Sequence, residues 1–231
     1  RRFEREIKRF EKAGDLARAA RLYEEAEWYP EAINMYVQAK DYVSAATLHE
    51  ELEQWERAAD MYFQAEDWKR AAQMLVKVGK HAEAAKHFNQ HGQKIDAAKL
   101  YFDAGQYDKA AVLYEDVSYF PQAAKCFEKL GEHVKAAHNY EQQWFASTSA
   151  GGGGLIAAGG SDREARVALH AGKLYEQGGA PERAAEFYKR AGLSQQAAEL
   201  AAKEGRYLDA AELLLKEENL KGAAEMFEKA G

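Results

Sequence analysis

The sequence predicts an all-α protein, an α-solenoid of short antiparallel helical hairpins stacked on one another. Two observations support this prediction: pairs of alanine recur every 13 residues, and a broad apolar face recurs with them. The composition agrees, because only 3 of the 231 residues are proline and good helix formers are abundant. Units too small to bury their own apolar face are stable only when neighbouring units stack against them.

The alanine pairs fix the register of the repeat, and the first alanine of each pair is taken as position 0. The pairs begin at Ala19, Ala45, Ala58, Ala71, Ala84, Ala97, Ala110, Ala123 and Ala136, and again at Ala184, Ala197, Ala210 and Ala223. Imperfect members at Glu6, Ala32 and Ala171 complete a series of about sixteen helical units. Eleven of these units lie in residues 1–144 and five in residues 162–231.

Each unit is expected to form one helix of roughly ten residues followed by a tight turn. Apolar side chains at −3, +3, +4 and +7 give one face roughly 160° wide. Glycine is frequent at +8, where a left-handed residue ends a helix without a clash. Asp15, Asp41 and Asp67 follow that position and are expected to cap the next helix. Two consecutive units make one helical hairpin, which is two repeat periods long.

Residues 145–161 interrupt the repeat with the string FASTSAGGGGLIAAGGS, which contains four successive glycines and no charged residue. The sequence predicts a flexible, Gly-rich insertion between two solenoid blocks, residues 1–144 and 162–231. Ser161 and Glu164 form a capping box that predicts a helix through about Gln177. Leu155 and Ile156 are candidates for docking on a partner, and a tolerated loop insertion is the plainer interpretation.

The string GQYDKAAVLYE, residues 105–115, resembles the tetratricopeptide-like superfamily, as do residues 15–23 and 67–75. The short units also resemble those of soluble NSF-attachment proteins and of the helical tails of coat and intraflagellar-transport subunits. This resemblance implies a TPR-like fold and a non-enzymatic scaffold within a multi-subunit trafficking or ciliary complex. It also implies other protein subunits as partners and a location in the cytoplasm or the cilium.

Composition and motifs narrow the function classes. The 32 basic and 38 acidic residues leave a formal charge of −6, and no basic stripe is present, so nucleic acid is not an expected partner. The sequence contains no run of about 18 apolar residues, so it predicts no membrane span. Neither a phosphate-binding loop nor a catalytic set can be found, so we expect no enzyme activity, no cofactor and no small-molecule substrate.

Three histidines of one unit and the single cysteine are the candidates for metal binding and thiol chemistry. His87 and His91 are four residues apart and His81 lies in the same unit, a spacing that suits a metal ion. However, all three occupy positions that hold core residues in other units, which favours a structural role and no metal site. Cys126 lies on an apolar face and is expected to be a buried, inert thiol.

Apolar residues at +5 are candidates for partner binding, because other units carry glutamate there. They are Val37, Phe63, Val76, Phe102 and Leu215. Two interpretations remain open for them: contact with a partner on a concave surface, or burial on both flanks of a helix. The aromatic residues at −3, by contrast, are expected to pack in the core. They are Tyr29, Tyr42, Trp55 and Trp68.

Two further functions are compatible with these observations. One is a peptide-binding adaptor that holds an extended or helical segment in its groove. The other is an accessory solenoid of a larger enzyme whose catalytic domain lies outside this chain. Phe3 and Gly231 already fit the repeat register at the two ends, so we expect this chain to be a segment of a longer solenoid.

Overall fold

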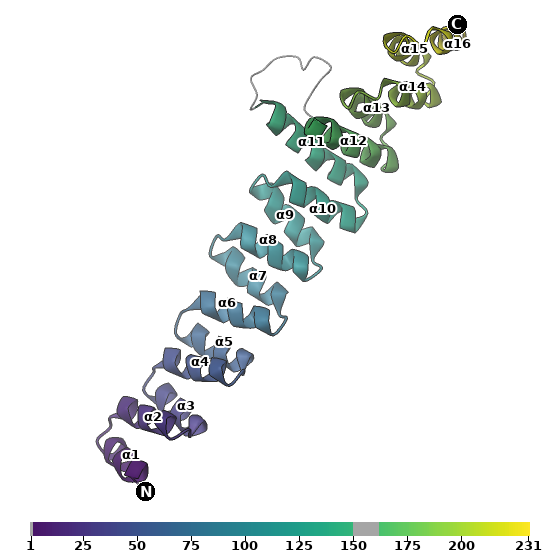
Figure 1. Cartoon of the computed structure of the whole chain (residues 1–231). Helices are drawn as coiled ribbons and strands as arrows, with labels where there is room; N and C mark the ends of the chain where they lie inside the picture. The colour runs from purple at the N-terminus through teal and green to yellow at the C-terminus, as the bar shows by residue number, and fades with distance from the viewer. Residues whose placement is uncertain (1, 150–161) are drawn as a thin grey trace. The chain divides into compact units, whose positions relative to one another are not determined.

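The computed structural model describes residues 2–149 and 162–231, and this part of the chain contains sixteen helices and no strand (Figure 1). The chain divides into two compact units, residues 1–106 and 107–231. The first unit contains α1 (Arg2–Lys12), α2 (Leu16–Glu25), α3 (Tyr29–Gln38), α4 (Tyr42–Glu51), α5 (Trp55–Gln64), α6 (Trp68–Lys77), α7 (His81–Gln90) and α8 (Lys94–Asp103). The second contains α9 (Tyr107–Asp116), α10 (Phe120–Leu130), α11 (His133–Ser149), α12 (Asp162–Gln177), α13 (Pro181–Arg190), α14 (Ser194–Lys203), α15 (Tyr207–Lys216) and α16 (Leu220–Ala230).

The helices follow the predicted period. From α2 to α11, and again from α13 to α16, each helix begins one repeat period after the start of the helix before it. Within each unit every helix packs against the next one in the sequence, and the chain reverses at the short turns between them (Figure 1). The all-α solenoid of stacked helical hairpins is therefore confirmed for the described residues.

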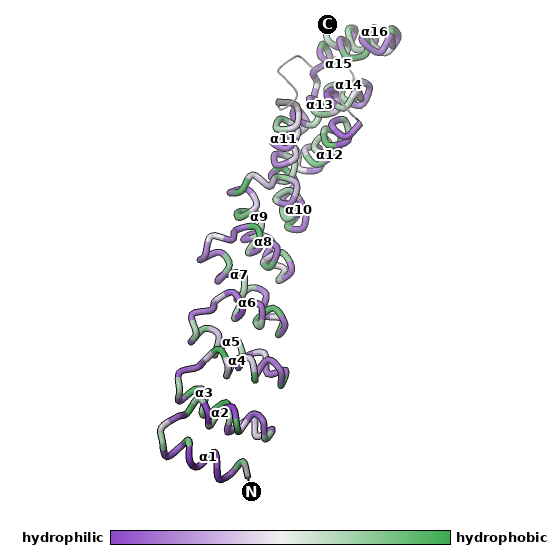
Figure 2. The backbone as a smooth tube through the Cα atoms, turned by 60° about the vertical axis from the view of Figure 1, so that its left-hand side comes forward, coloured by the Kyte–Doolittle hydropathy of each residue, from purple (hydrophilic) through white to green (hydrophobic). Residues whose placement is uncertain are grey.

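Figure 2 shows hydrophobic and hydrophilic residues alternating within single helices, as expected for helices with one apolar face each. None of the helices in the described ranges is both long enough and apolar enough to cross a membrane.

The turns confirm the predicted left-handed residue at +8. Gly105, for example, has a φ of 71° and Glu66 a φ of 58°, and the other left-handed residues of the described chain fall at the same position. The helix after the turn then begins at a cap. Asp15, Asp41 and Asp67 accept hydrogen bonds of 3.0–3.2 Å from the backbone N–H of the residue three positions later, as predicted.

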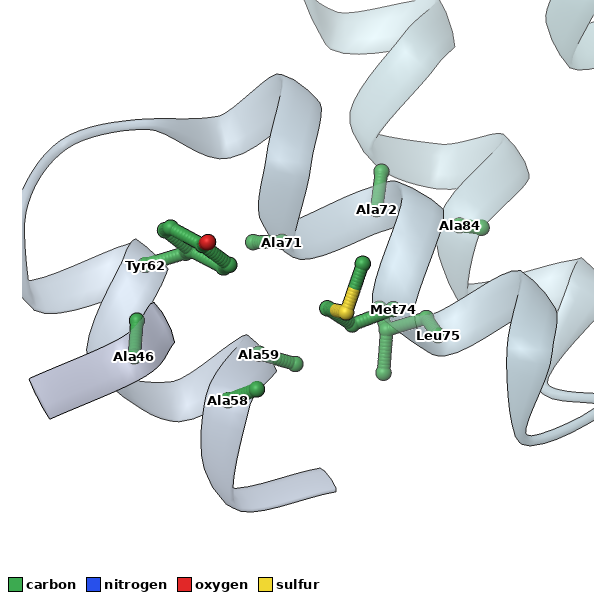
Figure 3. Packing of buried hydrophobic residues seen from close by; sticks show 9 residues of the cluster. All are labelled: Ala46, Ala58, Ala59, Tyr62, Ala71, Ala72, Met74, Leu75 and Ala84. Atoms are coloured by element: carbon green, nitrogen blue, oxygen red, sulfur yellow. The ribbon is translucent and has the colours of Figure 1, made fainter. Parts of the chain in front are cut away.

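The alanine pairs form the contacts between neighbouring helices. Ala58, Ala71 and Ala72 are fully buried, and in Figure 3 they lie in one cluster with Tyr62 and Met74. Because an alanine side chain is a single methyl group, the adjacent backbone can approach closely, and the larger side chains fill the space that remains. Burying a side chain of the size of methionine contributes about 1.5–3 kcal/mol.

The interruption differs from the expected one in one respect. Residues 145–149, which the sequence analysis assigned to the flexible insertion, are helical and continue α11 to Ser149. Helices α11 and α12 pack against each other as consecutive helices. The division into solenoid blocks of residues 1–144 and 162–231 stays a prediction. The helix expected to end near Gln177 does end there, while Ser161 lies outside the described residues.

Candidate functional site

Hydrogen bonds between tyrosine and glutamate join consecutive helices. The hydroxyl of Tyr36, at +4 of α3, donates to Glu24, at +5 of α2, at 2.6 Å. Tyr62 of α5 donates in the same way to Glu50 of α4, at 3.0 Å. The same arrangement is present in Tyr23–Glu11, Tyr140–Glu128, Tyr175–Glu141 and Tyr188–Glu176. Burial, followed by the hydrogen bond to Glu24, raises the pKa of Tyr36 well above its ordinary value.

An open groove of about 670 Å³ lies over α2, α3 and α4, and we call it the α2–α4 groove. It is lined by Arg21, Glu24, Glu25, Glu27, Tyr29, Tyr36, Ser44, Thr47, Leu48 and Glu51. Helix α2 and the turn after it supply most of the carboxylates, α3 supplies the two tyrosine rings, and α4 supplies two hydroxyl groups and a further carboxylate. The groove therefore combines aromatic surface with hydrogen-bond acceptors.

The lining of the α2–α4 groove is strongly acidic. Its four glutamates and one arginine give a formal charge of 1 − 4 = −3. Glu25, Glu27 and Glu51 form no ion pair with any residue in the part of the chain that the structure describes. The hydroxyl of Tyr36 satisfies one oxygen of Glu24, and its other oxygen has no partner within the same described residues. Such a groove attracts positively charged groups.

The equivalent place further along the stack, between α4 and α6, is occupied by a side chain of the protein itself. The Nζ atom of Lys77 lies 4.0 Å from the centroid of the Trp55 ring and 3.4 Å from Oε1 of Glu50. The other oxygen of Glu50 accepts the hydroxyl of Tyr62. Lys77 thus combines a cation–π contact with a charge-assisted hydrogen bond. We call Glu50, Trp55 and Lys77 the α4–α6 site.

The α2–α4 groove and the α4–α6 site are equivalent in the repeat. Trp55, Glu50 and Lys77 lie one hairpin, which is two repeat periods, after Tyr29, Glu24 and Glu51. The ring and the carboxylate are therefore present in both places. Only the last position differs, because lysine stands in one where glutamate stands in the other.

Sequence reasoning did not find the α2–α4 groove, because its residues come from three helices and mostly occupy polar positions. One signal was available. A glutamate followed by a tyrosine twelve residues later, as in Glu24 and Tyr36, marks the hydrogen bond between consecutive helices. Nothing in the lining forms a catalytic set, and no group of metal-ligating side chains was found among the described residues.

The candidate residues of the sequence analysis lie elsewhere. Val37, Phe63 and Val76 are half-buried and pack against the apolar clusters between helices. Phe102 is also half-buried, whereas Leu215 is 44% exposed. None of these five side chains lines the α2–α4 groove. Leu155 and Ile156 lie outside the described residues. A role of any of these residues in partner binding stays a prediction.

His87 and His91 contact aromatic rings, although His91 is exposed, and Cys126 lies in the core. The ring of His91 stacks on Trp68 with a centroid distance of 3.9 Å and an interplanar angle of 11°, and His87 lies 4.5 Å from the Phe63 ring. Cys126 is fully buried, and burial raises the pKa of its thiol to about 11. At neutral pH the thiolate, which is the nucleophilic form, is therefore rare in the folded protein.

Short helices that pack in sequence make the described part of the chain an all-α helical-repeat protein. Neither a family model nor a curated protein matches the sequence. Among solved structures, one similar to this chain is described as the nearly identical TPR-like repeats of a putative kinesin light chain from Podosopora anserina. Its sequence is 12% identical to this chain, the match covers 89% of this chain and 96% of the other, and the TM-score is 0.28. BtubC (BKLC) from P. vanneervenii is 16% identical over 99% of this chain and 89% of its own, with a TM-score of 0.27.

Proposed function

We propose that this chain is a non-enzymatic scaffold for protein–protein interaction. The alanine pairs at the centre of the apolar faces are buried in the stacking of the helices, so function falls to the side chains that remain exposed. The α2–α4 groove is the observation that supports the proposal most directly. It is open, lined by aromatic and acidic side chains, and contains carboxylates without partners in the described chain. A surface of this kind favours recognition of another molecule over chemistry on a substrate.

The narrower proposal is that the chain forms part of a larger subunit in a trafficking or ciliary transport assembly. It is supported by the resemblance of the short repeat units to those of soluble NSF-attachment proteins and intraflagellar-transport subunits. The partners would then be other protein subunits, and the protein would act in the cytoplasm or the cilium.

A peptide-binding adaptor is the second candidate, and the same groove favours it. Two of its walls, α2 and α4, are helices of ten residues each, which is about 15 Å of length. A segment of a partner that enters this groove would meet the rings of Tyr29 and Tyr36 and the hydroxyl groups of Ser44 and Thr47.

The scaffold proposal is tested by purifying the native full-length protein after treatment with a zero-length crosslinker, which joins carboxylates to amines. We expect other protein chains in stoichiometric amounts, with crosslinks at glutamates of the solenoid. A native protein that elutes alone at its own mass would contradict the scaffold. So would a catalytic activity that is lost on substitution of residues within the solenoid.

A further inference from the structure

We propose that the α2–α4 groove binds a lysine side chain of a partner protein. This inference rests on the proposed scaffold function and names the chemistry that the groove recognises. The ligand is the ammonium group of a lysine-bearing segment, which would lie over the ring of Tyr29 and beside the carboxylates of Glu24 and Glu51.

The α4–α6 site provides the template for this contact. There the ammonium group of Lys77 is 4.0 Å from the ring centroid of Trp55 and 3.4 Å from Glu50. The hydroxyl of Tyr62 holds the opposite oxygen of Glu50, which keeps that carboxylate in place. The protein therefore already shows, one hairpin further along, how its own repeat holds an ammonium group.

The α2–α4 groove has the same parts without the lysine. Tyr29 supplies the ring, and Glu24 supplies the carboxylate, held by Tyr36 at 2.6 Å. Glu51 stands where Lys77 stands in the template, so no ammonium group is delivered from α4. The exchange of lysine for glutamate also adds a further acceptor and makes this position negative where the template is positive.

Within the first compact unit, the combination of ring, carboxylate and charged third residue is restricted to these two places. In the following step, from α6 to α8, Val76 takes the place of the glutamate and His81 the place of the tyrosine or tryptophan. Asp103 stands at the third position there. This acidic residue is therefore not accompanied by a tyrosine or tryptophan at the second position or by a glutamate at the first. This position provides a control for the effect of an acidic surface alone.

The chemistry favours ammonium over a metal ion or an anion. A tyrosine ring attracts a cation through its face, while a divalent metal ion needs several oxygen ligands gathered around one point. Lysine matches the template directly, and its compact charge fits beside a carboxylate over a ring. An anionic or acidic segment would be repelled by the four glutamates of the lining.

The first test uses the full chain, labelled with ¹⁵N, and a capped tetralysine peptide at about 0.05 M ionic strength, where charges are weakly screened. The same peptide with Nε-acetylated lysines is the control for charge. We expect amide shifts that concentrate on α2, α3 and α4 and that are absent with the acetylated peptide. Shifts spread evenly over all acidic helices, or equal binding of both peptides, would overturn the inference.

Two variants with the same change in charge distinguish specific binding in the groove from a general effect of surface charge. Glu51→Lys places an ammonium group where Lys77 lies in the template, and we expect it to weaken peptide binding about tenfold or more. Asp103→Lys is at the same repeat position of α8, and we expect less than about a twofold change. Equal loss in both variants would refute a specific groove. Far-ultraviolet circular dichroism checks that both variants keep their helices.

The opposite exchange, Lys77→Glu, removes the lysine from the template and should create a second binding site. The indole N–H of Trp55 then reports binding, and we expect its resonance to shift on titration in this variant and to stay unchanged in the original protein. An unchanged resonance in the folded variant would contradict the inference. The scaffold proposal is judged separately: if the native partners stay bound to the Glu51→Lys protein, the scaffold stands and lysine recognition by this groove is not what holds them.

Discussion

Tyr175 of α12 donates a hydrogen bond of 2.5 Å to Glu141 of α11, although 34 residues separate them. The other bonds of this kind that we describe join residues 12 apart. The units at Ala136 and Ala171 are likewise farther apart than one repeat period, and the excess over the usual spacing is the same in both cases. The insertion therefore lengthens the connection between two helices and leaves their contact in register.

Replacing Tyr175 by phenylalanine tests how much this contact contributes. Both Tyr175 and Glu141 are 3% exposed, and Arg183 donates to the same carboxylate at 2.8 Å. Losing the hydroxyl leaves a buried carboxylate short of one donor, so we expect the free energy of unfolding to fall by about 1–3 kcal/mol. Urea unfolding followed by circular dichroism measures it.

The matched control is Tyr23→Phe, which removes the bond of Tyr23 to Glu11, at 2.8 Å, where water reaches the pair. Water replaces the lost donor there, so the expected loss is about 0.5–1 kcal/mol. Equal losses in the two variants would show that burial does not set the strength of these bonds.

A second prediction transfers the bond to a place that lacks it. Val76 of α6 and Phe88 of α7 hold the two positions of the pair and pack against the same apolar cluster. Val76→Glu alone and Phe88→Tyr alone should each destabilise the protein, because each puts a polar group among apolar ones. Together they should recover about 1–2 kcal/mol of the summed loss through the new hydrogen bond.

The measurement is a double-mutant cycle from urea unfolding of the four proteins. The cycle also tests Val76 as a candidate for partner binding. A favourable coupling between the substitutions at positions 76 and 88 would assign position 76 to the contact between helices. Strictly additive losses would mean that the tyrosine–glutamate pair needs more of its surroundings than these two positions.

A third prediction concerns the left-handed turn residues. Glu66 adopts a φ of 58°, a conformation that costs a side-chain-bearing residue about 1–2 kcal/mol. Glycine avoids this cost but gives up more chain entropy on folding. We expect Glu66→Gly to stabilise the protein by about 0.5–1 kcal/mol, and Gly105→Ala, at a φ of 71°, to destabilise it by a similar amount. Thermal melts of both variants give the answer, and a gain from Glu66→Ala as large as that from Glu66→Gly would exclude the backbone as the cause.

The helix positions were predictable because they depend on a local, repeated requirement. A short helix needs a left-handed stop and a small residue at the close approach to its neighbour, and both recur with the repeat period. Alanine at 0 and glycine at +8 therefore located the turns without any knowledge of tertiary contacts.

The end of α11 was not predictable, because its cause is a distant contact. The string that follows Trp144 is small and uncharged, as a flexible segment would be. In the structure, the ring centroids of Trp144 and Phe145 lie 4.8 and 5.1 Å from the guanidinium carbon of Arg190, which belongs to α13. Packing against another helix thus outweighs the weak helix propensity of the string.

The α2–α4 groove was missed for a similar reason. Glu51 occupies a polar position of the repeat, where a charged residue is ordinary. Its significance appears only when Lys77 is seen filling the equivalent place on α6, beside Trp55. A comparison of residues one hairpin apart gives this signal, whereas composition and the repeat period do not.

The last prediction concerns Cys126. Burial raises the pKa of its thiol from an ordinary value of 9.0 to about 11, so the folded protein holds this proton more tightly than the unfolded chain does. The stability that this proton contributes is complete below pH 9.0 and is lost as the pH rises toward about 11. The buried tyrosines, whose pKa values are also raised, add a loss of the same sign at still higher pH.

Replacing Cys126 by alanine should therefore flatten part of the alkaline loss. We expect the free energy of unfolding to fall less between about pH 8 and pH 10 in Cys126→Ala than in the original protein, since the variant has no thiol to release. Tyr36, whose pKa burial also raises, titrates alike in both proteins and cancels in the comparison. A thiol reagent at about pH 8 gives an independent reading, because a buried thiol reacts only when the surrounding helices open. Labelling of the native protein as fast as that of a free cysteine would show that α10 does not hold Cys126 away from solvent.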